Sequence, residues 1–487
     1  MSADVGTSTT TTPGGLAVEA NGINVIDESE RKGTPRGLFW PWCAANIAVL
    51  AVSYGAFLLG FGISLWQALL AGVVGTILSF LLVGLVSLAG KRGSAPTLVL
   101  SRAAFGVRGN ALPALVSYVL LVGWEIILVS LSTLAVTTVF DRLGWAHGTP
   151  VKVVAFVVVA AVIVVAGIKG FDAIIKLQTW LTIVLAIVTV GYVLLTLDHI
   201  HWSTASGLPS GGGRSVLGAM IFAATALGIG WVNAGADYSR YLPRSSSSRG
   251  VVWWTTFGAS VAPVVLIVYG VFLVASNSKL SDAIGADPIG ALTSILPTWY
   301  LVPFVVVAVG GLVAGAVLDI YSSGLNLLTL GLPIQRWQAA AVDGVLMILG
   351  SIYVLFVSTD FQATFIGFLI TLGVPIAAWC GVFLADLLLR RRDYDEAALY
   401  DANGRYGHIG WVAVLTMVVA TVLGWGLVTN GTDGFTWQGY LLDPFGLGGK
   451  GGDWAYANLG VLAALVVGFV VPFALSQGTV RRQEQAA

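Results

Sequence analysis

Long apolar segments alternate with short polar ones along most of the chain. A helix needs about 20 mostly apolar residues to cross the hydrocarbon core of a bilayer, and twelve segments meet or approach that length. The pattern therefore predicts an all-α polytopic membrane protein with 12 transmembrane helices, in which the long eighth segment is tilted or broken. The segments lie near residues 41–65, 67–90, 111–139, 152–168, 177–197, 215–235, 251–276, 299–330, 339–357, 361–389, 408–429 and 454–476.

The distribution of positive charge sets the expected topology. With the N-terminus placed in the cytoplasm, the outer loops hold only five of the 24 lysines and arginines, and the inner loops and tails hold the other 19. This asymmetry favours cytoplasmic N- and C-termini, and we expect the chain in the plasma membrane. The five outer positions are Arg142, Lys152, Arg214, Lys279 and Lys450.

Composition excludes several classes of function. The 487 residues are 57% hydrophobic and 10% charged, whereas soluble domains carry about 25% charged residues. A net charge of zero argues against a nucleic-acid partner. The four histidines fall in expected loops or at helix ends, and no HExxH or aspartate-rich motif lies in a span, so we expect no metal, no cofactor and no enzymatic activity. Oligomeric state is left open.

The eighth segment carries the clearest polar exception to the apolar rule. Asp319, Ser322, Ser323 and Asn326 are spaced i, i+3, i+4 and i+7, which places them on one face of a helix. An ionisable group at the centre of a span costs about 2.5–3.5 kcal/mol on insertion scales, so we expect Asp319 to face a cavity and to have a function. The serines either share that function or join two helices.

The third segment contains a second carboxylate, Glu125, which should lie near mid-bilayer because it is 14 residues after the start of the segment 111–139 and 14 before its end. Burial favours the neutral form of a carboxyl group, so Asp319 and Glu125 are the candidate proton-coupling residues, and both are also candidate substrate-binding residues. Trp124 and Trp231 lie away from the expected helix ends. Each is either an aromatic platform for a ligand or one more tryptophan of the interface belts.

The first and sixth segments are each interrupted by glycine and polar residues. They are five helices apart and cross the membrane in opposite directions, which is typical of an inverted-repeat transporter with its site at the midplane. The glycines can instead serve close helix packing. The candidate substrate-binding residues in the two segments are Asn46, Gly55, Gly228, Trp231 and Asn233.

Three motifs together resemble the nucleobase–cation symporter-1 family, and the purine/cytosine permeases within it. They are ADYSRYLP at residues 236–243, SRAAFGVRGNALP at 101–113 followed by Gly123 and Trp124, and DIYSSGLNL at 319–327. The resemblance implies a leucine-transporter-type fold of five plus five inverted-repeat helices with two peripheral helices. It also implies that Trp124 is the stacking tryptophan and that Asp319 replaces the substrate-reading amide of the eighth helix. Trp231 is near the family's sixth-helix aromatic, where a gapless match places Gly228.

The chain departs from the family at positions that bear on coupling and substrate. Val313 and Ala314 stand where family members with a sodium site carry Ser or Thr, and their side chains offer no oxygen ligand. Together with the carboxylate of Asp319, this favours a proton as the coupling ion. Leu128 replaces a polar position on the third helix, which leaves the substrate open.

The leading hypothesis is a secondary active importer of cytosine or purines, proton-coupled and working by alternating access. The alternative is an importer of the same fold for allantoin, a hydantoin, uracil or a pyrimidine vitamin precursor, with sodium as the alternative coupling ion. A membrane-embedded enzyme is the remaining class. We expect a disordered cytoplasmic tail over residues 1–35, a ten-helix transport core over 36–397, and helices 11 and 12 with the C-terminus over 398–487. The glycine-rich stretch 446–452 has no assigned role.

Overall fold

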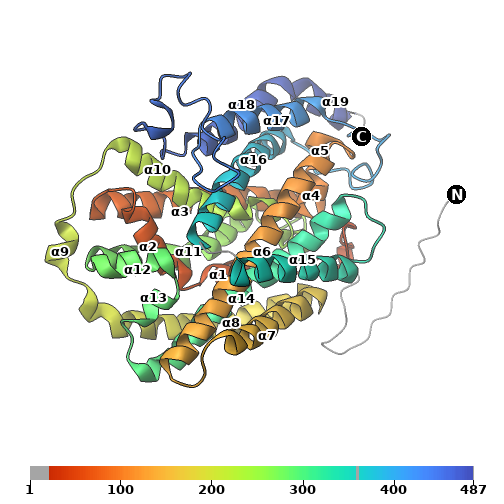
Figure 1. The fold of residues 1–487 in the computed structure, drawn as a ribbon. Helices are drawn as coiled ribbons and strands as arrows, with labels where there is room; N and C mark the ends of the chain where they lie inside the picture. Colours follow the sequence, from red (N-terminus) through yellow and green to blue (C-terminus); the bar gives the residue numbers. More distant parts are fainter. Residues whose placement is uncertain (1–20, 170, 358–360, 486–487) are drawn as a thin grey trace.

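A computed structural model describes residues 21–169, 171–357 and 361–485. Within these ranges the chain is helical and contains no β-strand (Figure 1). The α-helices are α1 (Phe39–Asn46), α2 (Leu50–Leu59), α3 (Leu65–Gly93), α4 (Thr97–Leu100), α5 (Arg102–Phe105), α6 (Ala111–Arg142), α7 (Thr149–Lys169), α8 (Phe171–Thr196), α9 (Trp202–Ser206), α10 (Gly213–Ala224), α11 (Ser248–Ala275), α12 (Ser278–Ala286), α13 (Gly290–Thr293), α14 (Leu301–Thr329), α15 (Arg336–Phe356), α16 (Phe361–Leu389), α17 (Trp411–Gly426), α18 (Leu459–Leu475) and α19 (Gln477–Gln485).

Every apolar segment expected to span the membrane is helical, but the count of twelve spans is not confirmed. Among the described residues nine helices are long and apolar enough to cross a bilayer, or up to eleven if each sharply bent pair is one span. Helix α17 is apolar but has only 16 residues. Helix α14 is continuous over its 29 residues. The eighth segment is therefore not broken, and its length of about 43 Å at 1.5 Å per residue requires tilt in a hydrocarbon core of about 30 Å.

The first and sixth segments are broken, as their sequences predict. Helices α1 and α2 meet at an angle of 66°. In the sixth segment α10 passes into a π-helix, Thr225–Ile229, and then into a 3₁₀ turn, Val232–Ala234. Both interruptions leave backbone groups outside regular helix, which is tolerated at membrane depth only where protein or a cavity surrounds them.

Two glycines of the broken segments bring helices into close contact. A Cβ atom at Gly55 would lie 2.3 Å from the Gly270 carbonyl carbon of α11, and one at Gly228 would lie 2.2 Å from the Ser79 carbonyl carbon of α3. No side chain fits at such distances. The packing alternative therefore accounts for both glycines.

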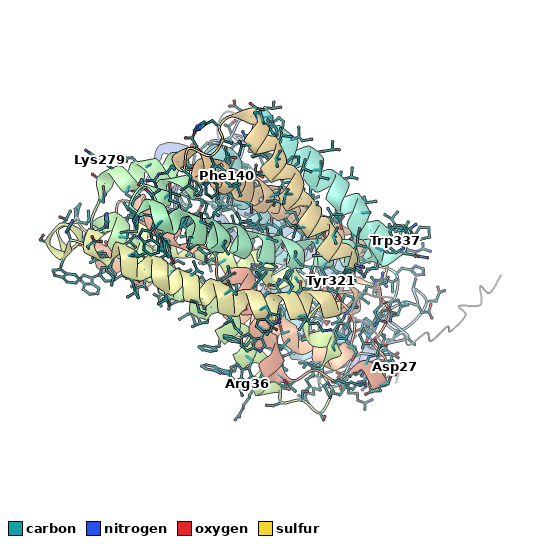
Figure 2. The ribbon with its side chains drawn as sticks, turned by 90° about the horizontal axis from the view of Figure 1, so that it is seen from below. Asp27, Arg36, Phe140, Lys279, Tyr321 and Trp337 are labelled. Carbon is teal, nitrogen blue, oxygen red and sulfur yellow. The ribbon has the colours of Figure 1, made fainter. Side chains whose placement is uncertain are left out.

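Charged loops gather at two opposite ends of the molecule. At one end Arg31 contacts Glu396 at 3.1 Å and Arg92 contacts Asp393 at 3.3 Å. At the other end Arg214 pairs with Asp453. Figure 2 shows Lys279 and Asp27 at opposite ends. The loops expected on each side thus meet one another, while their assignment to cytoplasm or exterior stays a prediction.

The segment before α1 corrects one expectation. Residues 1–20 of the expected disordered tail lie outside the described residues, but residues 21–35 are packed against the protein. Ile26 is fully buried and its amide donates to the Ser94 carbonyl, while the Arg31 guanidinium donates to the Ile26 carbonyl. Disorder is therefore wrong for this part of the tail. The short, mostly polar sequence did not indicate that this segment packs against the protein through one apolar side chain, Ile26, and one buried arginine, Arg31.

The last two long helices lie at one edge of the bundle. Figure 1 shows α17 and α18 together beside α16. Gly468 of α18 packs against Ala378 of α16, where a Cβ atom would lie 2.3 Å from the Ala378 carbonyl oxygen. Helix α18 also contacts α10 of the sixth segment, and the Asn458 amide at the start of α18 donates to the Gly218 carbonyl at 3.3 Å.

Candidate substrate cavity

A cavity of about 60 Å³ lies where the two broken segments meet α6 and α14. Its volume is small beside the roughly 300–1,000 Å³ typical of drug-sized ligand pockets, which favours a small solute. Residues of the π-helix form one wall, and π-helical turns occur frequently at functional sites. The lining comprises Ala45, Asn46, Ala48, Leu50, Ala51, Tyr54, Trp124, Leu128, Ala226, Leu227, Trp231, Gly311, Leu312, Gly315 and Asp319.

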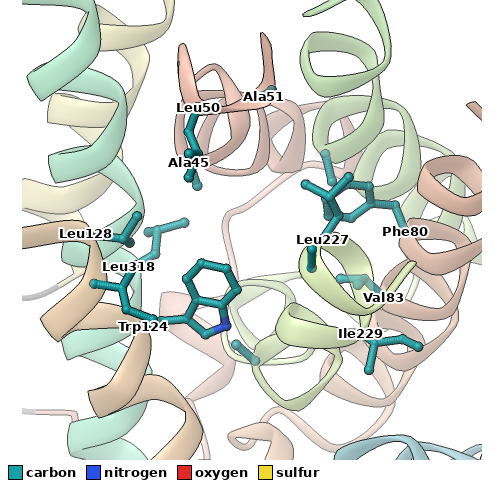
Figure 3. Packing of buried hydrophobic residues seen from close by; sticks show 14 of the residues in the cluster. Ala45, Leu50, Ala51, Phe80, Val83, Trp124, Leu128, Leu227, Ile229 and Leu318 are labelled. Atoms are coloured by element: carbon teal, nitrogen blue, oxygen red, sulfur yellow. The ribbon is translucent and has the colours of Figure 1, made fainter. Parts of the chain in front are cut away.

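Trp124 supplies an aromatic ring to the cavity wall. Figure 3 shows its indole pointing from α6 into the space between Leu128 and Leu227. A Cβ atom at Gly230 would lie 3.2 Å from Trp124 Nε1, so this glycine leaves room for the indole. The rings of Phe365 and Phe368 meet the indole edge-on at 5.6 and 6.1 Å. These contacts hold Trp124 in place while one face stays towards the cavity.

Asp319 is the carboxylate of the cavity wall. It is 2% exposed, its Oδ2 atom has no hydrogen-bond partner, and no described residue donates to Oδ1. A buried carboxyl group without partners is costly unless something else satisfies it. The expectation that Asp319 faces a cavity is confirmed by its position in the lining.

Asn46 and Trp231 line the cavity from the two breaks. The Asn46 side-chain amide donates to the Trp42 carbonyl at 2.8 Å, and Asn46 is part of the cavity lining. The Trp231 ring meets the Trp42 ring edge-on at 5.7 Å, and Trp42 meets Tyr238 in the same way at 5.5 Å. These three rings form a layer, here called the inner aromatic layer, between the cavity and the end that carries Arg31.

Six of the residues expected to bind substrate do not line the cavity. Gly55 and Gly228 pack against neighbouring helices as described above. The Ser322 hydroxyl lies 3.2 Å from the Tyr238 hydroxyl, and the Asn233 amide donates to the Ser117 hydroxyl at 2.6 Å. The other two are Glu125 and Ser323, which contact each other.

Most side chains of the polar stripe of α14 contact neighbouring helices and do not line the cavity. The Asn326 amide donates to Ser117 at 2.6 Å, so one hydroxyl on α6 accepts from both the sixth segment and α14. All of these side chains are buried. The helix-joining alternative therefore accounts for Ser322, Asn233 and Asn326, and only Asp319 of the stripe reaches the cavity.

Sequence reasoning missed one buried carboxylate, Asp343 of α15. The Ser323 hydroxyl contacts Glu125 Oε1 at 2.7 Å and Asp343 Oδ2 at 3.0 Å, and all three residues are fully buried. The signal was available, because Asp343 is a charged residue inside the ninth apolar segment. The rule that singled out Asp319 applies equally to it.

The ADYSRYLP motif fixes the end of the sixth segment that lies on the same side of the cavity as Arg31. The backbone amide and the hydroxyl of Thr97 donate to Asp237 Oδ1 at 2.8 and 2.7 Å. The Tyr238 hydroxyl donates to the Leu318 carbonyl at 2.9 Å, and Arg240 donates to the Gly22 carbonyl at 2.7 Å. The motif thus ties α4, α14 and the N-terminal segment together on that side of the cavity.

A larger opening lies on the other side of the cavity. This vestibule has a volume of about 1240 Å³ and is lined in part by Arg214, Asp282 and Asp453 from the loops expected to be outside. The rings of Phe57 and Phe222 line it and contact Tyr54 of the cavity, with centroids 5.8 and 6.3 Å away. These three rings, here called the outer aromatic layer, thus connect the lining of the vestibule to the lining of the cavity.

The chain resembles solved transporters in fold. It superposes on Mhp1, a nucleobase–cation-symport-1 family transporter in a closed conformation with bromovinylhydantoin bound, with a TM-score of 0.68, 18% identity and coverage of 97% of this chain and 100% of that one. A sodium-coupled sialic acid symporter gives a TM-score of 0.58 at 13% identity, over 92% of this chain and 91% of that one. The expected leucine-transporter-type fold is confirmed.

Sequence comparison identifies the family. The chain is 23% identical over 418 residues to YxlA of Bacillus subtilis, named provisionally as a purine-cytosine permease, covering 84% of this chain and 88% of that protein. It is 25% identical over 385 residues to the cytosine permease of Escherichia coli K12, covering 75% and 80%. The family model described as permease for cytosine/purines, uracil, thiamine, allantoin matches residues 25–442. The chain therefore belongs to this family of cytosine and purine permeases.

Proposed function

We propose that this permease imports a nucleobase, cytosine or a purine, by proton-coupled symport. The observation that carries the proposal is the juxtaposition of Trp124, Trp231 and the partnerless Asp319 around one small cavity at the breaks of two helices. A planar base stacks on an aromatic face, and its ring nitrogens and exocyclic groups pair with a carboxyl group. A carboxyl group both donates and accepts when protonated, which suits either kind of base edge.

The geometry around the cavity supports alternating access. On the vestibule side, the outer aromatic layer is the barrier. The opposite side is closed by three successive sets of contacts: the inner aromatic layer, the ADYSRYLP contacts and the packing of residues 21–35. This asymmetry fits a conformation that admits solute from the vestibule. With both termini in the cytoplasm, as the positive-inside rule favours, the vestibule faces the exterior of the plasma membrane.

The part of α14 that contacts the break between α1 and α2 carries no side-chain oxygen. This supports a proton rather than sodium as the coupling ion. A Cβ atom at Gly311 would lie 2.7 Å from the Ile47 carbonyl oxygen, and one at Gly315 would lie 3.5 Å from the Ala45 carbonyl oxygen. Val313 and Ala314 lie between these glycines. Sodium needs oxygen ligands, and none of these four side chains offers one.

A second substrate class follows from one lining residue. Leu128 places an apolar side chain in the cavity, where a polar residue is expected from the family resemblance. The site therefore has fewer polar groups with which to select a particular base edge. Uracil, allantoin and hydantoins are the alternative substrates, and neither these nor nucleobases require an enzymatic step in the proposed cycle.

Uptake into cells that lack their own nucleobase permeases tests the proposal. Radiolabelled cytosine, adenine and hypoxanthine are offered with and without a protonophore, and in sodium or potassium buffer. The expected result is uptake of at least one base that the protonophore abolishes and sodium does not affect. Competition by unlabelled uracil, allantoin and a hydantoin ranks the alternatives. Absence of uptake for all three bases, with the protein present in the membrane, would contradict the proposal.

A further inference from the structure

A buried polar group lies behind the cavity wall, where α6, α14 and α15 meet. Glu125 follows Trp124 on α6, so the tryptophan faces the cavity while the carboxylate turns towards α15. Ser323 lies one helical turn beyond Asp319 on α14. Its hydroxyl oxygen is 2.7 Å from Glu125 Oε1 and 3.0 Å from Asp343 Oδ2. Glu125, Ser323 and Asp343, here called the carboxylate pair and its bridge, are fully buried.

The hydrogen-bond count of this group requires a proton beyond that of the serine. A serine hydroxyl carries one hydrogen and donates to one acceptor, whereas an ionised carboxylate only accepts. With both carboxylates ionised, Ser323 would donate to one carboxylate, and its oxygen would face an oxygen of the other with no hydrogen between them. Two negative charges would also be buried side by side. One proton on either carboxyl group removes the conflict, because that group donates to Ser323 and Ser323 donates to the other.

The surroundings supply no cation to take the place of that proton. In the described part of the chain no lysine or arginine forms an ion pair with Glu125 or Asp343, and Glu125 Oε2 and Asp343 Oδ1 have no hydrogen-bond partner. On α15, Arg336 donates to the Gly167 carbonyl at 2.8 Å and to the Ile168 carbonyl at 2.5 Å. The other ionisable groups that face the pair carry no positive charge: they are Asp319 of α14 and the Tyr118 hydroxyl of α6, which is placed to donate to Asp343.

Helix α7, which packs against the same three helices, brings no charge to this depth. Its ionisable residues are Lys152 and Lys169, near its two ends. Lys152 donates to the Leu355 carbonyl at the vestibule end of α15. The interior of α7 between the two lysines is apolar. Two buried carboxylates without a cation are stable only if a proton lowers their combined charge.

We propose that Glu125 and Asp343, bridged by Ser323, share one exchangeable proton and form the coupling-proton site, distinct from the substrate-reading carboxyl group of Asp319. This inference rests on the proposed function. The proton comes from water at the vestibule side and returns to water at the opposite side. Each transfer changes only which oxygen carries it.

The path from substrate to proton is short. A substrate stacked on Trp124 contacts α6, the helix that carries Glu125. A substrate bound to Asp319 contacts α14, the helix that carries Ser323. A small displacement of α6 relative to α14 breaks one of the two bridge contacts. The pair then no longer holds the shared proton in the same geometry. Binding and protonation at neighbouring positions on the same two helices are thereby linked.

Transport by purified protein in liposomes tests the site. Wild type is compared with Asp343→Asn and Glu125→Gln, which keep shape and remove one titratable group each. Two readouts are taken, exchange of radiolabelled base between equal internal and external pools, and accumulation driven by an imposed pH gradient. Both variants are expected to exchange base within about threefold of wild type but to lose gradient-driven accumulation. Asp282→Asn, a carboxylate of the vestibule, is the matched control and is expected to keep both activities.

The bridge gives an independent measurement if a carboxylate variant does not fold. Ser323→Ala is expected to shift the pH dependence of uptake, whereas Ser130→Ala is not, since the Ser130 hydroxyl donates only to the Ile126 carbonyl of its own helix. Gradient-driven accumulation by Asp343→Asn equal to wild type, or an unchanged pH profile for Ser323→Ala, would overturn the inference. Failure of wild type to exchange any base would instead overturn the proposed function.

Discussion

Replacing Asp319 separates substrate binding from folding more clearly than any other substitution in the cavity. The carboxyl group lines the cavity and has no hydrogen-bond partner among the described residues, so its removal breaks no hydrogen bond there. A hydrogen bond that involves a charged group contributes about 1.5–3 kcal/mol, and each 1.4 kcal/mol is about tenfold in Kd. Asp319→Ala should therefore weaken base binding by roughly 10- to 150-fold.

The same substitution should leave the protein at least as stable as wild type. A buried carboxyl group without a partner is unfavourable, and alanine removes it. Residues that serve function at the expense of stability behave in this way. Asp319→Asn keeps one donor and one acceptor at the same place, and its Kd should stay within about tenfold of wild type. The two variants thus distinguish loss of hydrogen bonding from loss of charge.

The assay is equilibrium binding of radiolabelled cytosine or adenine to purified protein, with thermal unfolding measured on the same samples. Asp282→Ala is the control, because this carboxylate lines the vestibule and not the cavity. A wild-type Kd for Asp319→Ala, at the same fraction of active protein, would refute the assigned role. A large fall in melting temperature would show that Asp319 has a structural partner and would refute the reasoning about stability.

Three further predictions concern the cavity wall and its supports. Trp124→Ala should weaken binding about 2- to 12-fold, since aromatic contacts contribute about 0.5–1.5 kcal/mol beyond buried area, and Trp124→Phe should recover part of the loss; a Kd equal to wild type for the alanine variant would contradict stacking. Gly55→Ala should lower the melting temperature through overpacking of about 1–3 kcal/mol, whereas Gly431→Ala, with nothing within 4 Å of its added Cβ, should not. Ser117→Ala should destabilise the protein by about 1–3 kcal/mol for each amide left without its acceptor, compared with Ser130→Ala by thermal unfolding.

The broken helices show what periodicity and composition predict well. Glycine and polar residues interrupt the first and sixth segments in the sequence, and the structure places a 66° bend and a π-helix there. Asp319 was singled out by the cost of a charge in an apolar segment, and it lies at the cavity. These features follow from local rules, because irregular backbone and a buried charge at membrane depth both require polar or aqueous surroundings.

The orientation of individual side chains was not predictable in the same way. The polar stripe of α14 occupies one helix face, yet Asp319 lines the cavity, Ser323 contacts two carboxylates and Asn326 contacts Ser117. A helix face about 100° wide meets more than one neighbour, so its side chains have different surroundings. Gly55 and Gly228 have the composition expected of a binding segment but serve close packing. Asp343 is visible in the sequence as a charge in an apolar segment, but its grouping with Glu125 and Ser323 is not, because these residues are 218 and 20 positions away. Only the tertiary structure brings the three together.

The N-terminal segment is a further example of tertiary contacts that local sequence does not indicate. Residues 21–35 are short of apolar residues and resemble a linker. Their packing depends on Ile26 and on acceptors and donors contributed by Ser94, Arg240 and Glu396. Each partner comes from a different loop of one end of the molecule, so the contact exists only after the helices have assembled.

The most direct test of the central claim is an experimental structure of the protein with cytosine or adenine bound. The account predicts a flat ligand in the cavity between the first and sixth segments, stacked on Trp124, with a polar edge within hydrogen-bond distance of Asp319. Ligand bound only in the vestibule near Arg214 and Asp282, or Asp319 turned away from the bound base, would contradict it.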